Sequence, residues 1–193
     1  MPKIDFEKER NSLDRQITFF HFKRAKKKIS KCIKRAKQTQ DKFFLYYFLA
    51  QDKILGEDYS KAIDYLDKAL RIRKTDGCTY NDKALCLADL GKLKKALNCF
   101  NEGIKRDRDC ASLYHNKGWL LNLLKEYKKA ILCFRKALEL GEDRPEALYS
   151  LADTYYHLGQ KTLARKYFKK ALREIKGKSA YMRREALKRL SQV

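Results

Sequence analysis

Four alanines recur at equal intervals along the chain, and each begins the same kind of phrase. Ala62, Ala96, Ala130 and Ala164 open AIDYLDKALRI, ALNCFNEGIKR, AILCFRKALEL and ARKYFKKALRE. A fixed period of this kind indicates an array of stacked helix pairs, because one pair alone is too small to bury its apolar face. Such an array presents an extended surface, so the period predicts a protein that holds another molecule rather than converting it.

Each period contains two apolar helical patterns that flank a short turn. Apolar residues separated by three or four positions precede and follow each turn, as expected for one buried face of a helix. The turns are predicted near Gly56, Gly91, Lys125 and Gly159. Because Gly56 comes one residue earlier in its period than the others, we expect a slightly different bend in the first repeat.

The residue pattern over residues 43–176 resembles the tetratricopeptide repeat. That motif has a small residue at position 8, an aromatic residue at position 24 and a small residue at position 27. These positions hold Ala50, Ala84, Gly118 and Ala152, then Leu66, Phe100, Phe134 and Phe168, then Ala69, Gly103, Ala137 and Ala171. The resemblance implies an all-α fold, a right-handed superhelix (α-solenoid) of antiparallel helix pairs.

We expect one domain over residues 1–193. Four repeats are predicted at residues 43–76, 77–110, 111–144 and 145–178. A degenerate helix pair over residues 1–42 precedes them, and an amphipathic helix over residues 179–193 follows them. A terminal helix with a polar outer face covers the last exposed core of a solenoid.

No pattern of catalytic, metal-binding or cofactor-binding residues stands out. The chain contains no glycine-rich phosphate loop and no nucleophile elbow, and its six cysteines and three histidines have no metal-site spacing. We therefore expect a protein that is not an enzyme and has no cofactor. The cysteines fit a reducing compartment, and the sequence shows neither a signal peptide nor a membrane-spanning segment. These features predict a cytoplasmic protein.

The net charge of +22 is concentrated towards the two ends of the chain. Residues 1–42 carry +9 and residues 160–193 carry +10, whereas residues 43–159 carry only +3. The candidate basic patch consists of Lys23, Arg24, Lys26, Lys27, Lys28, Lys31, Lys34, Arg35, Arg183 and Arg184. One interpretation is a solvated helix face. The other is a surface that binds the backbone of RNA or DNA through counterion release.

The resemblance also implies that the first helix of each repeat lines a concave groove. The candidate groove residues are Tyr47, Gln51, Asn81, His115, Asn116, Trp119, Asn122, Tyr149, Asp153 and Tyr156. Aromatic rings and side-chain amides are suited to holding a peptide. The predicted function is a protein–protein interaction scaffold that binds a peptide segment or helix of a partner, with nucleic-acid association as the alternative. Trp119 is either a binding anchor or a residue packed between adjacent helices, and an exposed end face could self-associate.

Overall fold

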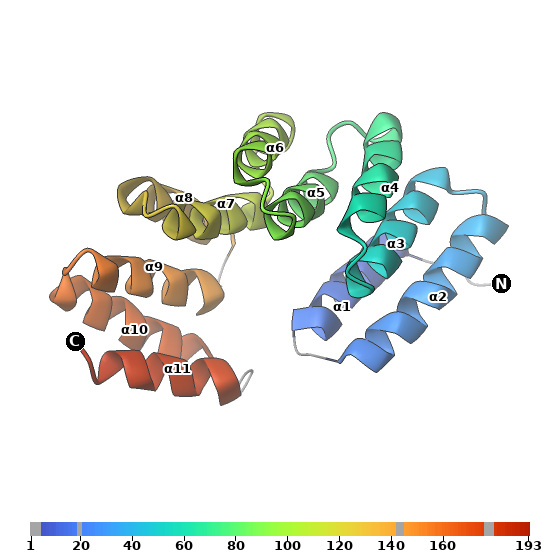
Figure 1. Cartoon of the computed structure of the whole chain (residues 1–193). Helices are drawn as coiled ribbons and strands as arrows, with labels where there is room; N and C mark the ends of the chain where they lie inside the picture. Colours follow the sequence, from blue (N-terminus) through green and yellow to red (C-terminus); the bar gives the residue numbers. More distant parts are fainter. Residues whose placement is uncertain (1–4, 19–20, 142–144, 176–179) are drawn as a thin grey trace. The chain divides into compact units, whose positions relative to one another are not determined.

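The computed structural model describes residues 5–18, 21–141, 145–175 and 180–193, which form helices and turns with no strand among them. The chain divides into two compact units, an N-terminal unit over residues 1–106 and a C-terminal unit over residues 107–193. Figure 1 labels the helices of both units. The described part of the N-terminal unit contains α1 (Phe6–Thr18), α2 (Phe22–Gln38), α3 (Lys42–Leu55), α4 (Tyr59–Ile72), α5 (Gly77–Asp89) and α6 (Leu93–Arg106). That of the C-terminal unit contains α7 (Ala111–Leu123), α8 (Tyr127–Leu140), α9 (Pro145–His157), α10 (Lys161–Ile175) and α11 (Ala180–Leu190).

Consecutive helices pack in pairs within each unit. The pairs α3–α4 and α5–α6 form hairpins in the N-terminal unit, and α7–α8 and α9–α10 do so in the C-terminal unit. The second helix of one pair also packs on the first helix of the next, as α4 does on α5 and α8 on α9. The predicted all-α class of stacked helix pairs is therefore confirmed. The extent of a single domain over the whole chain stays a prediction.

Small residues allow the paired helices to approach closely. The four evenly spaced alanines are completely buried, as are Phe100, Phe134 and Phe168 of the second helices. Gly118 illustrates the tightness of this packing, because a Cβ atom there would lie only 2.8 Å from the ring of Phe134. At such distances a core has no room for an added methyl group without moving its neighbour.

The turns inside the four repeats share one backbone conformation. Glu57, Gly91, Lys125 and Gly159 all have a positive φ, between 58° and 72°, and they are spaced by one repeat period. Glycine adopts this left-handed conformation without steric cost, whereas glutamate and lysine adopt it here at a cost. The expectation of a different bend in the first repeat was wrong, because Gly56 has an ordinary φ of −95° and Glu57 takes the left-handed position.

Aspartates begin three consecutive helices of the N-terminal unit. The side chains of Asp41, Asp58 and Asp76 accept hydrogen bonds from backbone amides in the first turns of α3, α4 and α5. An aspartate at this position satisfies an amide that has no partner within the helix.

Among the described residues, no helix is long and apolar enough to cross a membrane.

Candidate partner-binding site

The candidate groove residues of the N-terminal unit converge on Asp82. Gln51 Nε2 donates a hydrogen bond of 2.6 Å to Asp82 Oδ2, and Asn81 Nδ2 donates one of 3.2 Å to Asp82 Oδ1. The Tyr47 hydroxyl also hydrogen-bonds to Asp82. The structure therefore brings Tyr47, Gln51 and Asn81 together around the carboxylate of Asp82. Helix periodicity places Asp82 on the same side as these residues, but it does not show that Asp82 is their shared partner.

Helix α1 covers this cluster. Tyr47 and Gln51 are only 1% and 3% exposed, and the guanidinium of Arg10 in α1 lies 5.3 Å from the centre of the Tyr47 ring. The sequence prediction singled out neither Phe6 nor Arg10 as a contact to these residues. The signal that could have found them is their spacing, because Phe6, Arg10 and Leu13 lie on one side of a helix.

The burial of Asp82 makes the stability of the N-terminal unit depend on pH. Burial raises the pKa of the Asp82 carboxyl from its ordinary 3.8 to about 7, the nearby Asp14 carboxylate adds to this rise, and the three hydrogen bonds oppose it. The folded state therefore binds the proton more tightly than the unfolded state. The stabilising contribution of this group is lost as the pH rises from about 4 to about 7 and is absent above it.

We expect that Asp82→Asn removes this pH dependence. The wild-type unit should lose stability between pH 5 and pH 8 that the variant does not lose. Over this range, the free energy of unfolding of the wild type should fall by about 2 kcal/mol more than that of the variant. Urea titrations at pH 5 and pH 8, monitored by hydrogen exchange of the backbone amides in α3 and α5, measure this difference. An equal response to pH in the two proteins would contradict the assignment to Asp82.

In the C-terminal unit, the candidate groove residues of α7 are more accessible. Trp119 is 43% exposed, and Leu123, one turn later on the same side of α7, is 57% exposed. Asn116, one turn before Trp119, is half-buried. His115 is also half-buried, and its ring meets the edge of Phe134 at a centroid distance of 5.6 Å. A stripe of two large apolar side chains next to an amide therefore faces solvent on α7.

The candidate residues of α9 instead contact neighbouring helices. Thr154 Oγ1 donates a hydrogen bond of 3.1 Å to Asn122 Oδ1, which links α9 to α7. Arg189 of α11 lies 3.2 Å from Asp153 Oδ1 through its Nε and 5.2 Å from the centre of the Tyr156 ring. The same guanidinium hydrogen-bonds to Tyr149. Tyr149, Asp153 and Tyr156 thus come together around one arginine.

The side chain of Arg189 does not lie where the amphipathic pattern of residues 179–193 predicts. The amphipathic pattern places Arg189 on the outward face of the last helix, with Arg183 and Arg184. In the structure, the Arg189 side chain is half-buried against α9, whereas Arg183 and Arg184 are exposed. The carboxylate of Asp153 and the rings of α9 explain the difference, because an arginine near a helix end reaches across to such partners.

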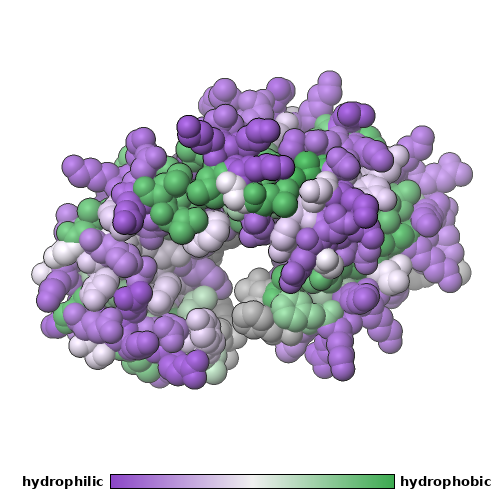
Figure 2. Space-filling model, viewed as in Figure 1, coloured by the Kyte–Doolittle hydropathy of each residue, from purple (hydrophilic) through white to green (hydrophobic). Residues whose placement is uncertain are grey.

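The basic residues of α2 form an exposed strip. Lys23, Arg24, Lys26, Lys27, Lys31 and Lys34 are exposed. Lys28 forms an ion pair with Glu9, and the half-buried Arg35 lies 3.4 Å from Gln38 Oε1. Arg183 and Arg184 belong to the C-terminal unit, whereas the other cations of the candidate basic patch belong to the N-terminal unit. Figure 2 shows hydrophilic side chains over much of the viewed face, with hydrophobic surface in smaller patches.

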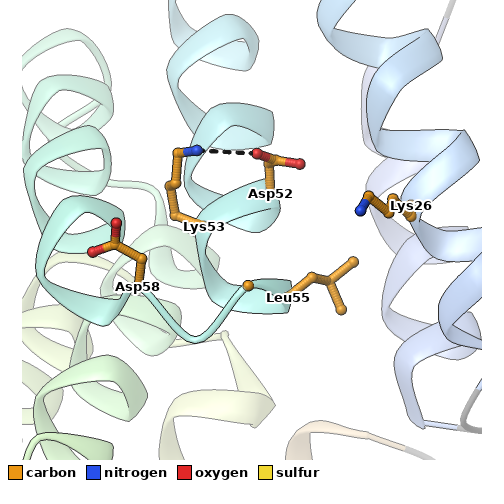
Figure 3. A pocket seen from close by; sticks show the side chains of 6 residues that line it. Lys26, Asp52, Lys53, Leu55 and Asp58 are labelled. Carbon is orange, nitrogen blue, oxygen red and sulfur yellow. Dashed lines mark hydrogen bonds and ion pairs between the residues drawn. The ribbon is translucent and has the colours of Figure 1, made fainter.

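A cavity of about 300 Å³ lies beside the basic strip, between α2 and the α3–α4 turn (Figure 3). Its lining is Lys26, Asp52, Lys53, Leu55, Gly56 and Asp58. Both aspartates already have partners, since Lys53 Nζ lies 3.3 Å from Asp52 Oδ2 and Asp58 caps α4. The lining contains no Ser, Thr, Cys, Tyr or His side chain.

The residues placed in the structure contain no group of three His, Cys, Asp or Glu side chains that could hold a metal ion. Burial raises the pKa of Cys32 to about 11 and that of Cys86 to about 12. These thiols therefore stay protonated at neutral pH, whereas a nucleophilic cysteine requires the thiolate.

Family models match most of the repeated region. Tetratricopeptide repeat models match residues 54–117, 111–143 and 145–177, and a model of anaphase-promoting complex subunit 5 matches residues 11–58. No curated protein sequence matches this chain.

Solved structures share the fold at low sequence identity. TTC0263, a thermophilic TPR protein of Thermus thermophilus, is 21% identical with a TM-score of 0.74, over 93% of this chain and 97% of its own. MamA is 22% identical with a TM-score of 0.64, over 86% of this chain and 95% of its own. YrrB, described as a TPR protein with an unusual peptide-binding site, is 19% identical with a TM-score of 0.61, over 92% of this chain and 89% of its own. The arrangement of helices is therefore that of proteins built from this repeat.

Proposed function

Since this chain belongs to the tetratricopeptide repeat proteins, we propose that it is a non-catalytic scaffold that binds a peptide segment or helix of another protein. The binding surface is the exposed side of α7, which carries the candidate groove residues Asn116 and Trp119. The observation that carries the proposal is the exposure of Trp119, whose side chain is 43% accessible on α7.

The apolar stripe on α7 provides the affinity. Trp119 and Leu123 stand one turn apart and both remain in contact with water, although large apolar side chains are stabilised by burial. Burying such side chains against a partner removes apolar surface from water, and tryptophan is among the residues that contribute most to protein interfaces. A peptide or helix that lies along α7 would cover both.

Amide side chains next to the stripe provide the polar contacts. Asn116 lies one turn before Trp119, and Asn122 lies beside Leu123 on the same helix. A carboxamide both donates and accepts hydrogen bonds, so it can satisfy the backbone groups of an extended peptide that the binding removes from water. The peptide-binding site named for YrrB, a protein of the same fold, supports a peptide as the partner.

Replacement of Trp119 tests this proposal. We expect Trp119→Ala to reduce the recovery of captured partner proteins at least tenfold, since truncation of a central tryptophan costs about 2 kcal/mol or more of binding energy. The measurement is affinity capture with the full chain at moderate salt, followed by mass spectrometry, with and without nuclease. Leu132→Ala is the matched control, because Leu132 is 65% exposed on α8 and lies outside the candidate groove.

The outcomes separate the alternatives. Partners that Trp119→Ala loses and Leu132→Ala retains support the groove, provided that far-UV circular dichroism shows both variants folded. Unchanged capture by Trp119→Ala would refute the role of this surface. Partners that disappear after nuclease treatment, or on charge reversal at Lys26, Lys27 and Lys28, would instead favour the nucleic-acid alternative.

A further inference from the structure

The outer side of α2 carries a straight row of lysines. Helix α2 packs on α1 and α3, and its buried side consists of Ala25, Ile29, Cys32 and Ala36. At about 100° per residue, five exposed lysines fall within an arc of about 120° on the opposite side of the helix. This lysine row consists of Lys23, Lys27, Lys31, Lys34 and Lys37. Its ends are 14 residues apart, so the row is about 21 Å long.

The lysine row has no counter-charge within the unit. Among the residues that the structure describes, none of its five side chains makes a hydrogen bond or an ion pair. Lys28, which lies outside the arc, pairs instead with Glu9 of α1. Helix α2 itself contains no aspartate or glutamate. The positive charge of the row is therefore available to an outside partner.

The row opposes the stability of its own helix. Neighbouring lysines of the row are three or four positions apart, which is the spacing at which like charges on a helix repel each other. His21 begins α2 without a side-chain cap, and the first turn contains Lys23 and Arg24 but no acidic residue. The start of a helix favours negative charge, so these two cations are unfavourable there. A bound polyanion would relieve both effects.

The chemistry of the row favours a phosphate backbone over a protein surface or a membrane. Protein interfaces are depleted in lysine and have an apolar centre, but no apolar residue of α2 lies within the arc of the row. The apolar side of α2 is buried in the unit, so the helix has no apolar side left to insert into a membrane surface. Interfaces with nucleic acids are strongly positive, and lysines there contact phosphates without reading the bases.

The same residues favour a duplex over a single strand. Proteins that bind single strands stack the bases on aromatic side chains, and the arc of the row contains no aromatic residue. A B-form duplex carries one phosphate per about 1.7 Å of its axis, or about 12 over the length of the row. Each lysine can therefore reach a phosphate whatever the base sequence is.

We propose that the lysine row of α2 binds the phosphate backbone of double-stranded nucleic acid without sequence preference. The row belongs to the N-terminal unit and Trp119 belongs to the C-terminal unit. Duplex binding is thus a second activity that goes beyond the proposed peptide site on α7 and does not replace it.

Fluorescence anisotropy with the full chain tests this activity. The probes are labelled DNA duplexes of two unrelated sequences and an RNA duplex, each about two helical turns long. For DNA, the logarithm of the association constant should fall with the logarithm of the salt concentration with a slope of about −4.5, because five lysines each neutralise one phosphate. The affinity should therefore fall about 500-fold between about 50 and 200 mM salt. Binding of either duplex through the row supports the proposal, and the comparison identifies the nucleic acid.

A triple substitution assigns the binding to the row. Lys27→Gln, Lys31→Gln and Lys34→Gln together should reduce the magnitude of the salt slope by about 2.7 and weaken binding at low salt at least tenfold. The same three positions changed to arginine should keep the wild-type slope. The matched control changes Lys92, Lys94 and Lys95 to glutamine, since these lysines are exposed at the start of α6 and their loss lowers the net charge equally. This control should keep the wild-type slope, and far-UV circular dichroism checks that all variants are folded.

Several results would overturn the proposal. Equal losses in the row variant and the α6 control would show that net charge, and not the row, binds the duplex. Absence of duplex binding at low salt, or tighter binding of a single strand of the same sequence, would also contradict it. Poly-glutamate or phosphatidylserine vesicles that bind at salt concentrations at which both duplexes are released would assign the row to another polyanion.

The peptide site and the lysine row are tested independently. Trp119→Ala should leave duplex binding unchanged, and the glutamine variant of the row should retain the nuclease-resistant partners that the wild-type chain captures. A failure of this inference therefore leaves the capture test on α7 intact, and the reverse also holds.

Discussion

Phe134→Ala is expected to destabilise the C-terminal unit by about 3–5 kcal/mol, the usual cost of removing a fully buried phenylalanine side chain. Phe134 is completely buried in α8. Its ring lies against the backbone of α7 at Gly118 and against the edge of His115. Because the glycine offers no side chain to move into the space, the cavity left by the substitution cannot collapse readily, and we expect a value in the upper half of this range.

The single tryptophan makes this prediction straightforward to measure. Trp119 is the only tryptophan of the chain and lies in the C-terminal unit, so its fluorescence during urea denaturation reports the unfolding of that unit. Leu132→Ala is the matched control, two residues earlier on the same helix and 65% exposed. We expect it to change the free energy of unfolding by less than about 0.5 kcal/mol. Similar destabilisation by both substitutions would show that Phe134 has no special role in the core.

Arg10→Met is expected to destabilise the N-terminal unit by about 3 kcal/mol. Arg10 Nη1 donates hydrogen bonds of 2.9 and 3.0 Å to the two carboxylate oxygens of Asp76, and the side chains of Arg10 and Asp76 are only 9% and 11% exposed. Methionine keeps most of the aliphatic volume but leaves the Asp76 carboxylate buried without its cation, and breaking one partner of a buried ion pair typically costs about 3–5 kcal/mol. The value should fall at the low end, because Asp76 keeps hydrogen bonds from the backbone amide and the hydroxyl of Thr79.

Hydrogen exchange resolves where this destabilisation occurs. Protection should fall most in α1 and in the first turn of α5, the two segments that the ion pair joins. Lys61→Met is the control, since Lys61 pairs with Asp58 at the surface with 69% of its side chain exposed, and surface pairs contribute little. A loss of protection as small as that of the control would mean that the ion pair of Arg10 does not hold α1.

The repeated part of the fold was predictable because its information is local and periodic. Ala62 and its equivalents mark the close approach of two helices in the same repeat, and Phe100 and its equivalents mark the space between them. The conformation at Glu57 was not predictable from glycine placement, because the position in the repeat, rather than the residue type, decides which residue takes the left-handed conformation. The position in the repeat was therefore a better guide to this backbone conformation than the residue type.

The contacts of the candidate site were less predictable for a physical reason. Arg10 contacts Asp76, 66 residues later, and Arg189 contacts Asp153 on another helix. Neither separation is a multiple of the repeat period, so no repeat position relates the partners. Periodicity places Tyr47, Gln51 and Trp119 on one side of their helices, but it does not reveal that α1 covers the first two.

The separation between Arg10 and Asp76 has a consequence for synthesis on the ribosome. When α1 emerges, the residue that holds its arginine has not yet been made, and at about 5–20 residues per second the interval is about 3–13 s. Helices α2 and α3 can pack on the apolar side of α1 within that interval, whereas Arg10 has to wait for Asp76. The polar contact that joins α1 to α5 is therefore the last contact of α1 to form.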